Sequence, residues 1–136
     1  MAVVVFDSDV LIGLLISSDV HRRDATSLMR EASVPGTLRM LCAVNYSEIL
    51  IGPLRAGKAE VVDEMLGHFF IDIVQVDMAL ARRAAAVRER TGIALPDAFA
   101  IATAIHAEKL GHSEVRLASF DKAVLRAHAD LHPYTS

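Results

Sequence analysis

The feature that most constrains this chain is a short apolar run near its start that ends in carboxylates. Residues 2–6 contain three valines and one phenylalanine, a β-branched run of strand length that is far shorter than a membrane span. Asp7, Ser8 and Asp9 follow directly, and the next apolar residues recur at helical spacing. The segment therefore predicts a buried strand leading into a helix, with acidic side chains at the carboxyl edge of a parallel sheet, where α/β proteins bind ligands.

A purely structural interpretation of these acids is also open. Ser8 or Asp9 can cap the following helix through a side-chain oxygen, and Asp7 can simply end the strand. On the evidence of Asp7 alone, the structural and functional interpretations are evenly balanced. A functional site requires further carboxylates that the fold brings to the same edge.

Short apolar runs alternate with helical patterns along the rest of the chain. This alternation is typical of a parallel sheet whose two faces are covered by helices. We predict one α/β domain over residues 1–136, a three-layer α/β/α arrangement around a mostly parallel sheet of about four to five strands. After the first strand, further strands are predicted at residues 38–43, 71–76 and 115–118, and a fifth would be an edge strand around Leu131.

Capping residues, prolines and glycines set the expected helix boundaries. Asp19 is expected to cap the second helix. A helix at residues 44–50 is expected to end near residues 52–53, a Gly-Pro pair. The clearest helix has Pro96 as its first residue and ends before Gly111, and its two apolar faces predict that it is buried.

Four acidic residues stand in apolar surroundings that do not suit a merely solvated charge. Asp7 and Asp121 follow predicted strands, so a parallel sheet would bring them to one edge. Asp97 lies in the first turn of the buried helix, where the helix dipole favours an ionised acid. Glu48 lies within a helix whose phase the sequence does not fix. Together these four residues predict one acidic site.

The chemistry of such a site follows from the repulsion between its carboxylates. Burial raises their pKa values unless a cation compensates the charge. Oxygen ligands without cysteine or paired histidines favour a hard ion, Mg²⁺ or Mn²⁺, which can polarise a phosphodiester and activate a water. Each acid has a structural alternative, Asp97 as an early-turn charge, Asp121 as a helix cap and Glu48 as an exposed residue. Jointly they favour metal-dependent phosphodiester hydrolysis.

Composition limits the expected partners. The formal net charge of −3 is unlike that of most nucleic-acid binders, but if four of the 17 acidic residues belong to a metal site, 13 remain against 14 Lys and Arg. Any contact with a nucleic acid must then come from a local patch or a partner subunit, with outward arginines such as Arg82 and Arg83 as weak candidates. Cys42 cannot form an internal disulfide, and the six histidines, His21 among them, lack metal-ligand spacing and are expected at the surface or at helix ends.

The expected location follows from length and hydropathy. The 136 residues are 53% hydrophobic, which is enough for a substantial core. The chain has neither the roughly 18 consecutive apolar residues of a membrane helix nor a leader with a cleavage site at its start. We expect a cytoplasmic protein without a membrane partner.

Four ordered segments of the chain resemble the motifs of PIN-domain ribonucleases. The chain is most similar to the bacterial VapC-type toxins of type II toxin–antitoxin systems. The segments follow the family's order over nearly the whole sequence, and the third is the most specific. They are VVFDSDVLI at residues 4–12, NYSEILIG at 45–52, LPDAFAIATA at 95–104 and LASFDKAVL at 117–125.

The resemblance implies a PIN-like fold in which four acids bind Mg²⁺ or Mn²⁺ and act as the catalytic residues of RNA cleavage. Asp9 stands where Ser, Thr or Asn is commoner in the family, and Phe120 replaces a residue that is often polar, which bears on the rim of the site. The implied catalytic and metal-binding acids are Asp7, Glu48, Asp97 and Asp121, and the supporting residues are Ser8, Asp9 and Ser119.

The resemblance also implies partners. VapC-like proteins cut RNA, form homodimers and are neutralised by a VapB-type antitoxin, whose tail commonly places Arg near the acids. An apolar groove of this chain is expected to hold that antitoxin. By resemblance, the residues of the groove are Ile49, Leu50, Leu54, Val61, Val62, Met65 and Leu66.

Two other functions fit parts of the sequence. A strand followed by Asp-x-Asp also resembles haloacid dehalogenase-like phosphatases, in which Asp7 would be a covalent nucleophile and Asp9 a general acid. That class needs a downstream Lys and a paired-acid loop, and the sequence has no convincing GDxxxD segment. The remaining alternative is a module that binds RNA or an antitoxin without cleavage, which the presence of all four acids does not favour.

Overall fold

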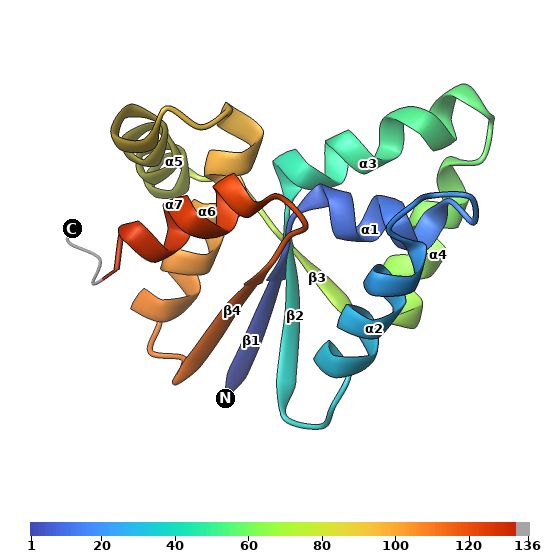
Figure 1. Ribbon diagram of the computed structural model, residues 1–136, viewed down its shortest axis with the longest axis horizontal. Helices are drawn as coiled ribbons and strands as arrows, with labels where there is room; N and C mark the ends of the chain where they lie inside the picture. Colours follow the sequence, from blue (N-terminus) through green and yellow to red (C-terminus); the bar gives the residue numbers. More distant parts are fainter. Residues whose placement is uncertain (133–136) are drawn as a thin grey trace.

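The computed structural model describes residues 1–132, and its centre is one sheet of parallel strands. Figure 1 shows the strands side by side in the order β3-β2-β1-β4. Each strand reaches the next through at least one helix, as parallel pairing requires. The predicted α/β class is confirmed. The strands are β1 (Ala2–Phe6), β2 (Thr37–Cys42), β3 (Ile71–Val74) and β4 (Glu114–Ala118).

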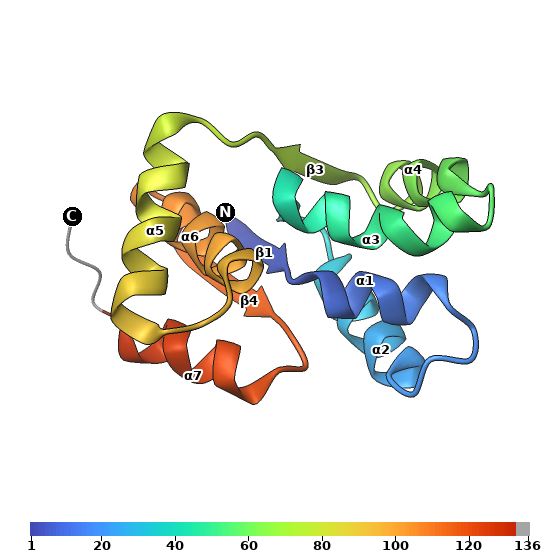
Figure 2. The ribbon, with the colours of Figure 1, turned by 90° about the horizontal axis from the view of Figure 1, so that it is seen from above.

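Helices cover both faces of the sheet and complete the predicted three layers. Figures 1 and 2 show α1 to α4 on one side of the strands and α5 to α7 on the other. On the first side lie α1 (Ser8–Leu15), α2 (Arg22–Ala32), α3 (Ala43–Arg55) and α4 (Ala59–His68). On the second side lie α5 (Met78–Thr91), α6 (Leu95–Lys109) and α7 (Lys122–Asp130).

Strand β1 shows why the apolar run at the start of the sequence is continuous. Successive side chains of a strand point to opposite faces. Val4 and Phe6 pack in the core formed with α1 to α4, whereas Val3 and Val5 pack in the core formed with α6 and α7. Because both faces are covered, every one of these positions has to be apolar. The strand is thereby fixed in the middle of the molecule, with its carboxyl end leading into α1.

Helix α6 is the most deeply buried helix of the second layer, as its two apolar faces predict. Ile101 and Ala104 are fully buried between the sheet and α5. The helix begins at Leu95, so Pro96 is its second residue rather than its first, a position that also needs no intrahelical N–H partner. Gly111, with a φ of 95°, follows the end of the helix. The burial of α6 fixes the place of the acid in its first turn.

Helix α3 is longer than predicted, because it does not end at the Gly-Pro pair. It runs through Gly52 and Pro53 to Arg55. Proline removes one hydrogen-bond donor, but the Gly52 carbonyl still accepts from the N–H of Ala56 at 3.2 Å, and the Pro53 carbonyl accepts from Lys58 at 2.8 Å. One missing bond near the end of a helix is therefore tolerated.

Two further expectations about helix and strand ends are wrong. Asp19 does not cap α2; its Oδ1 accepts from the N–H of His21 at 2.8 Å, within the preceding turn, and His21 occupies the cap position. Leu131 follows α7 in a helical conformation, so the described part of the chain has four strands and not five. No helix within residues 1–132 is both long and apolar enough to cross a membrane.

Candidate functional site

The predicted acids surround the carboxyl ends of β1 and β4, which are neighbours in the sheet. Asp7 directly follows β1, and its N–H donates to the Ala118 carbonyl at the end of β4 at 2.9 Å. Ser119 and Asp121 follow β4, so the parallel pairing of the two strands brings both segments to one edge. The geometry expected from sequence is therefore present at this edge.

Asp7 is buried, with 2% of its surface exposed, and it is the cap residue of α1. Its Oδ1 accepts from the N–H of Ser8 at 2.9 Å, and its Oδ2 accepts from the Ser119 hydroxyl at 2.9 Å. The structural alternative placed the cap one or two residues too late, at Ser8 or Asp9. The extended backbone of Asp7, with φ −76° and ψ 158°, is the conformation that a cap residue needs.

Burial raises the pKa of Asp7 to about 7. The loss of hydration is the largest cause, and the nearby charges of Asp9 and Asp97 raise the pKa further. The hydrogen bonds from Ser119 and Ser8 favour the ionised form but do not offset these effects. A change from 3.8 to about 7 corresponds to about 4 kcal/mol against the charged form.

Asp9 is held against the loop that follows β4. Its Oδ2 accepts from the N–H of Phe120 at 2.9 Å, and the Ser119 hydroxyl lies 3.4 Å from the same oxygen. Its Oδ1 is buried and has no hydrogen-bond partner within residues 1–132. Burial raises the pKa of Asp9, and the charge of Asp121 adds to this effect. A buried carboxylate oxygen without a partner is unfavourable, and a bound cation is one group that would satisfy it.

Asp97 and Asp121 complete the cluster from two different helices. Burial raises the pKa of Asp97, followed in size by the charges of Asp121, Glu48 and Asp9. Asp121 is exposed and caps α7, since its Oδ1 accepts from the N–H of Ala123 at 2.9 Å. The capping role expected for Asp121 is therefore real, and it coexists with a place beside the other acids.

Glu48 is positioned by a residue that the sequence prediction missed. Asn45 is fully buried, and its Nδ2 donates to Glu48 Oε1 at 3.0 Å and to the Pro96 carbonyl at 3.1 Å. It thereby ties α3 to the first turn of α6, beside Asp97. The available signal was its spacing, because Asn45 lies four residues before the buried Ile49 and hence on the inner face of the same helix.

These acids fit a hard divalent cation. All their ligand atoms are carboxylate oxygens, and Asp9 Oδ1 lacks a partner among the described residues. A cation beside Asp7 would offset the burial and the neighbouring acids that raise its pKa. Within residues 1–132, no group of three acidic, histidine or cysteine side chains lies close enough together to form a metal-ligand set. Mg²⁺ is commonly held by one or two carboxylates and keeps several waters.

The groove predicted on α3 and α4 is only partly a surface. Ile49, Val62 and Leu66 are core residues and cannot line it, which corrects the prediction for these three. Leu54 and Val61 are 60% and 40% exposed. The remaining two predicted residues, Leu50 and Met65, are half-buried.

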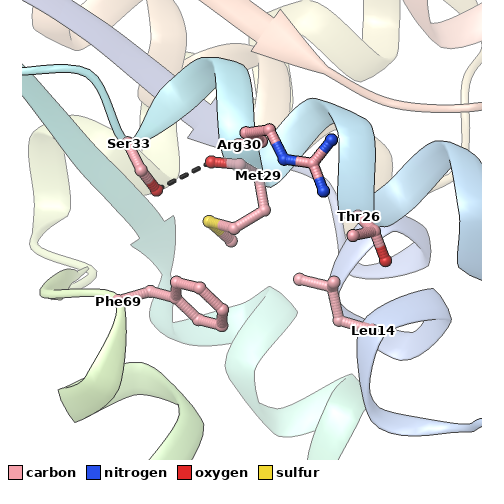
Figure 3. A pocket seen from close by; sticks show the side chains of 6 residues that line it. All are labelled: Leu14, Thr26, Met29, Arg30, Ser33 and Phe69. Carbon is pink, nitrogen blue, oxygen red and sulfur yellow. Dashed lines mark hydrogen bonds between the residues drawn. The ribbon is translucent and has the colours of Figure 1, made fainter.

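A separate open cavity of about 420 Å³ lies between α1, α2 and the end of α4. Figure 3 shows the side chains of Leu14, Met29 and Phe69 pointing into it, with Arg30 at its rim. The hydroxyl of Ser33 donates to the Met29 carbonyl at 2.7 Å on the same side. The cavity wall is mostly apolar, in contrast to the acidic edge of the sheet.

The fold and the site define an α/β protein with a cluster of carboxylates at the carboxyl ends of parallel strands. A family model described as the PIN domain matches residues 4–130. This chain therefore belongs to the PIN domain family, as its motifs indicated. No curated protein sequence matches it at a significant level.

Solved structures with the same fold include two toxin–antitoxin assemblies. One is described as a toxin-antitoxin complex from Klebsiella pneumoniae; it is 23% identical, covers 89% of this chain and 87% of its own, and has a TM-score of 0.67. The other is a structure of VapBC-1 from nontypeable Haemophilus influenzae, 13% identical over 96% of this chain and 94% of its own, with a TM-score of 0.65. At these identities the likeness establishes a shared fold.

Proposed function

We propose that this chain is a metal-dependent endoribonuclease of the VapC type, the toxin of a toxin–antitoxin pair, formed by one PIN-like nuclease domain over residues 1–136. The observation that carries the proposal is the juxtaposition of Asp7, Asp9 and Asp97, whose charges act on one another at the edge of the sheet. Membership in the PIN family and the toxin–antitoxin neighbours support it. The family assignment also favours a nuclease over the phosphatase alternative.

Asp7, Asp97, Asp121 and Glu48 are the residues that would hold Mg²⁺ or Mn²⁺. When bound, the ion supplies positive charge that polarises the phosphodiester and makes an attacking water more acidic.

The protein's own part in the chemistry is to hold these carboxylates in place and charged. Ser8 and Ser119 fix the two oxygens of Asp7, and Asn45 fixes Glu48. Asp9 is held by the N–H of Phe120, which leaves its second oxygen for the site. Such fixed orientation is worth much in hydrolysis, because the reacting groups need not reorganise.

The partners proposed with this function are RNA, a VapB-type antitoxin and a second copy of the chain. Support for the antitoxin comes from the neighbours, both of which are toxin–antitoxin structures. The partly exposed apolar residues of α3 and α4 are the surface we propose for it, namely Leu50, Leu54, Val61 and Met65. A cytoplasmic location fits an enzyme that acts on cellular RNA.

The test is cleavage of total cellular RNA by the purified protein with Mg²⁺, with Mn²⁺ or with a chelator. The comparison is between wild type and Asp97→Asn, which keeps the shape of the side chain and removes its charge. Asp77→Asn is a matched control, because Asp77 caps α5 and is separate from the acidic cluster. We expect metal-dependent cutting with 5′-phosphate ends by wild type and the control only.

Other results would contradict the proposal in distinct ways. Equal inactivity of folded wild type and Asp97→Asn on all RNA would favour the silent binding module. Capture of a covalent aspartyl-phosphate on Asp7 would favour the phosphatase. Cleavage that survives both the chelator and Asp97→Asn would show that a contaminating nuclease is responsible.

A further inference from the structure

Two aromatic side chains from distant parts of the sequence stack at the rim of the acidic site. His21 lies in the loop between α1 and α2, and Phe120 lies in the loop between β4 and α7. Their ring centroids are 4.5 Å apart and their planes differ by 17°. The sequence predicted a surface or helix-end position for His21, and the structure shows it exposed at the cap of α2, with its ring stacked against another ring.

The stack is joined directly to the acids. Phe120 lies between Ser119 and Asp121, and its own N–H donates to Asp9 Oδ2 at 2.9 Å. The first ring is therefore attached by its backbone to residues of the proposed cation site. Successive bases of a single strand lie only a few ångströms from the phosphate that joins them, so a phosphate at the acids brings a base to this rim.

The two rings differ in how they are covered. Phe120 is half-buried and packs against the core between the sheet and α1 to α4. His21 is exposed, so it extends the aromatic surface of Phe120 outward into solvent. A planar ring that is backed by a second, anchored ring is a preformed surface for stacking.

Exposed cations lie close in sequence to both rings and indicate what kind of planar group fits there. Arg22 and Arg23 follow His21 in sequence, and Lys122 follows Asp121; all three are exposed. Arg22 is held in place, since its Nη1 donates to the Leu14 carbonyl at 3.0 Å. An exposed aromatic surface with basic residues next to it in the sequence suits a nucleobase with its adjoining phosphates.

We propose that the His21–Phe120 stack is a base-binding subsite, on which an unpaired nucleobase next to the scissile phosphate stacks against His21. This rests on the proposed function and assigns a recognition role to residues outside the acidic cluster. Because every base has a flat aromatic face, the subsite selects single-stranded or looped RNA more than a particular base.

The chain contains a matched control for this pair. His68 and Phe69 are also a histidine and a phenylalanine with rings 4.7 Å apart, but their planes meet at 83°. They lie at the end of α4, next to the apolar cavity and away from the acids. This edge-on pair does not offer a backed flat surface, so the subsite proposal assigns it no part in binding RNA.

The experiment uses the Asp97→Asn protein, so that RNA is bound without being cut. The probe is a short single-stranded RNA of mixed sequence with one 2-aminopurine at its centre, whose fluorescence falls when the base stacks. Affinity is measured by anisotropy of an end label on the same RNA, and thermal melting checks that each variant is folded. The variants are His21→Ala, His21→Phe and the control His68→Ala.

We expect His21→Ala to weaken RNA binding about 5- to 100-fold and to abolish the quenching of 2-aminopurine, as loss of one stacked base does. His21→Phe should restore both signals, and His68→Ala should change neither. Tight binding that His21→Ala leaves unchanged would overturn the subsite alone. If His21→Phe does not restore binding, a polar contact of the imidazole and not stacking is responsible, which would overturn the subsite. Absence of RNA binding by the Asp97→Asn protein and by folded wild type alike would overturn both the subsite and the proposed function.

Discussion

Asp7 and Asp121 occupy equivalent positions after the neighbouring strands β1 and β4, yet they differ in how far helix capping explains the presence of an acid. Each follows a strand and caps the next helix with its Oδ1. Asp121 is exposed, and a capping role, worth about 0.5–2 kcal/mol, is enough to explain its presence. Asp7 is buried, and its pKa of about 7 implies a penalty of about 4 kcal/mol for its charge.

Capping alone therefore does not explain why position 7 holds a charged residue. Ser, Thr or Asn caps a helix equally well without a charge. A carboxylate whose ionisation destabilises the fold needs a reason other than capping. Its place beside other acids suggests that reason, because together they can bind a cation. We infer that the charge of Asp7 is compensated only when a cation is bound.

The buried Asp7 and the exposed Asp121 should differ most in their effect on catalysis. Asp7→Asn and Asp97→Asn should each lower the rate of RNA cleavage about 10²- to 10³-fold, because they remove charge from the centre of the site. Asp121→Asn at the exposed rim should cost about tenfold, in the range seen for supporting residues of metal sites. The measurement is kcat/KM on one RNA cut by wild type. Equal losses for all three variants would erase the distinction between centre and rim.

On stability, Asp7→Asn should be favourable although it lowers the rate of cleavage, and Asp121→Asn should have almost no effect. In the presence of a chelator at about pH 8, Asp7→Asn should raise the free energy of unfolding by up to about 4 kcal/mol, since the buried charge is removed. The Asn oxygen can still accept from Ser8, and its amide can donate to the Ser119 hydroxyl. Asp121→Asn should change stability by only a few tenths of a kcal/mol, because Asn and Asp are equivalent caps.

Urea unfolding followed by circular dichroism measures both values. A loss of stability in Asp7→Asn, at a pH where wild-type Asp7 is ionised, would show that its charge is already compensated within the protein.

The pH dependence of stability follows from the same raised pKa. Between about pH 4 and pH 7 the folded chain keeps a proton on Asp7 that the unfolded chain has lost, so stability falls as the pH rises through this window. The slope from this group is at most about 1.4 kcal/mol per pH unit. Asp9 and Asp97, whose pKa values are also raised, act in the same direction. The urea midpoint, measured in chelator, should fall as the pH rises from about 4 to about 7, and it should fall less in Asp7→Asn than in wild type. A midpoint that rises with pH would contradict the raised pKa of Asp7.

A further prediction concerns Asn45, the residue that orients Glu48. Asn45→Ala leaves the Glu48 carboxylate and the Pro96 carbonyl without their shared donor, which should lower stability by about 1–3 kcal/mol and cleavage by about tenfold. Ser47→Ala is the control, because Ser47 is an exposed residue of the same helix whose hydroxyl bonds only locally, to the Val44 carbonyl. Unfolding and kcat/KM are measured together. An unchanged kcat/KM in Asn45→Ala would show that the orientation of Glu48 does not contribute to cleavage.

Most of the layout of this fold could be predicted from the sequence, because its strongest signals are local. Apolar runs such as residues 2–6 and the Pro-to-Gly span of α6 identified the four strands and the buried helix. The acids adjoining β1 and β4 could be placed together because parallel strands share a carboxyl edge. The continuation of α3 past Pro53 was missed, since it depends on carbonyl partners in the following turn.

The parts of the site that escaped prediction depend on contacts between distant segments. Asn45 bonds to the first turn of α6, and Asp9 bonds to the loop after β4. The His21–Phe120 stack likewise joins two loops that the sequence separates widely. No local pattern carries such information. The sequence could predict which acids belong to the candidate site. Their burial, orientation and exposure depend on the packing of distant segments and could be read only from the structure.

The central claim is that the buried acids are kept for a divalent cation, and Mn²⁺ binding tests it most directly. Isothermal titration calorimetry at about pH 7 would compare wild type, Asp7→Asn and Asp121→Asn without RNA. We predict saturable binding by wild type with release of protons, a loss of at least about tenfold in affinity for Asp7→Asn and a smaller loss for Asp121→Asn. Absence of saturable Mn²⁺ binding to folded wild type, or an affinity that Asp7→Asn leaves unchanged, would contradict the claim.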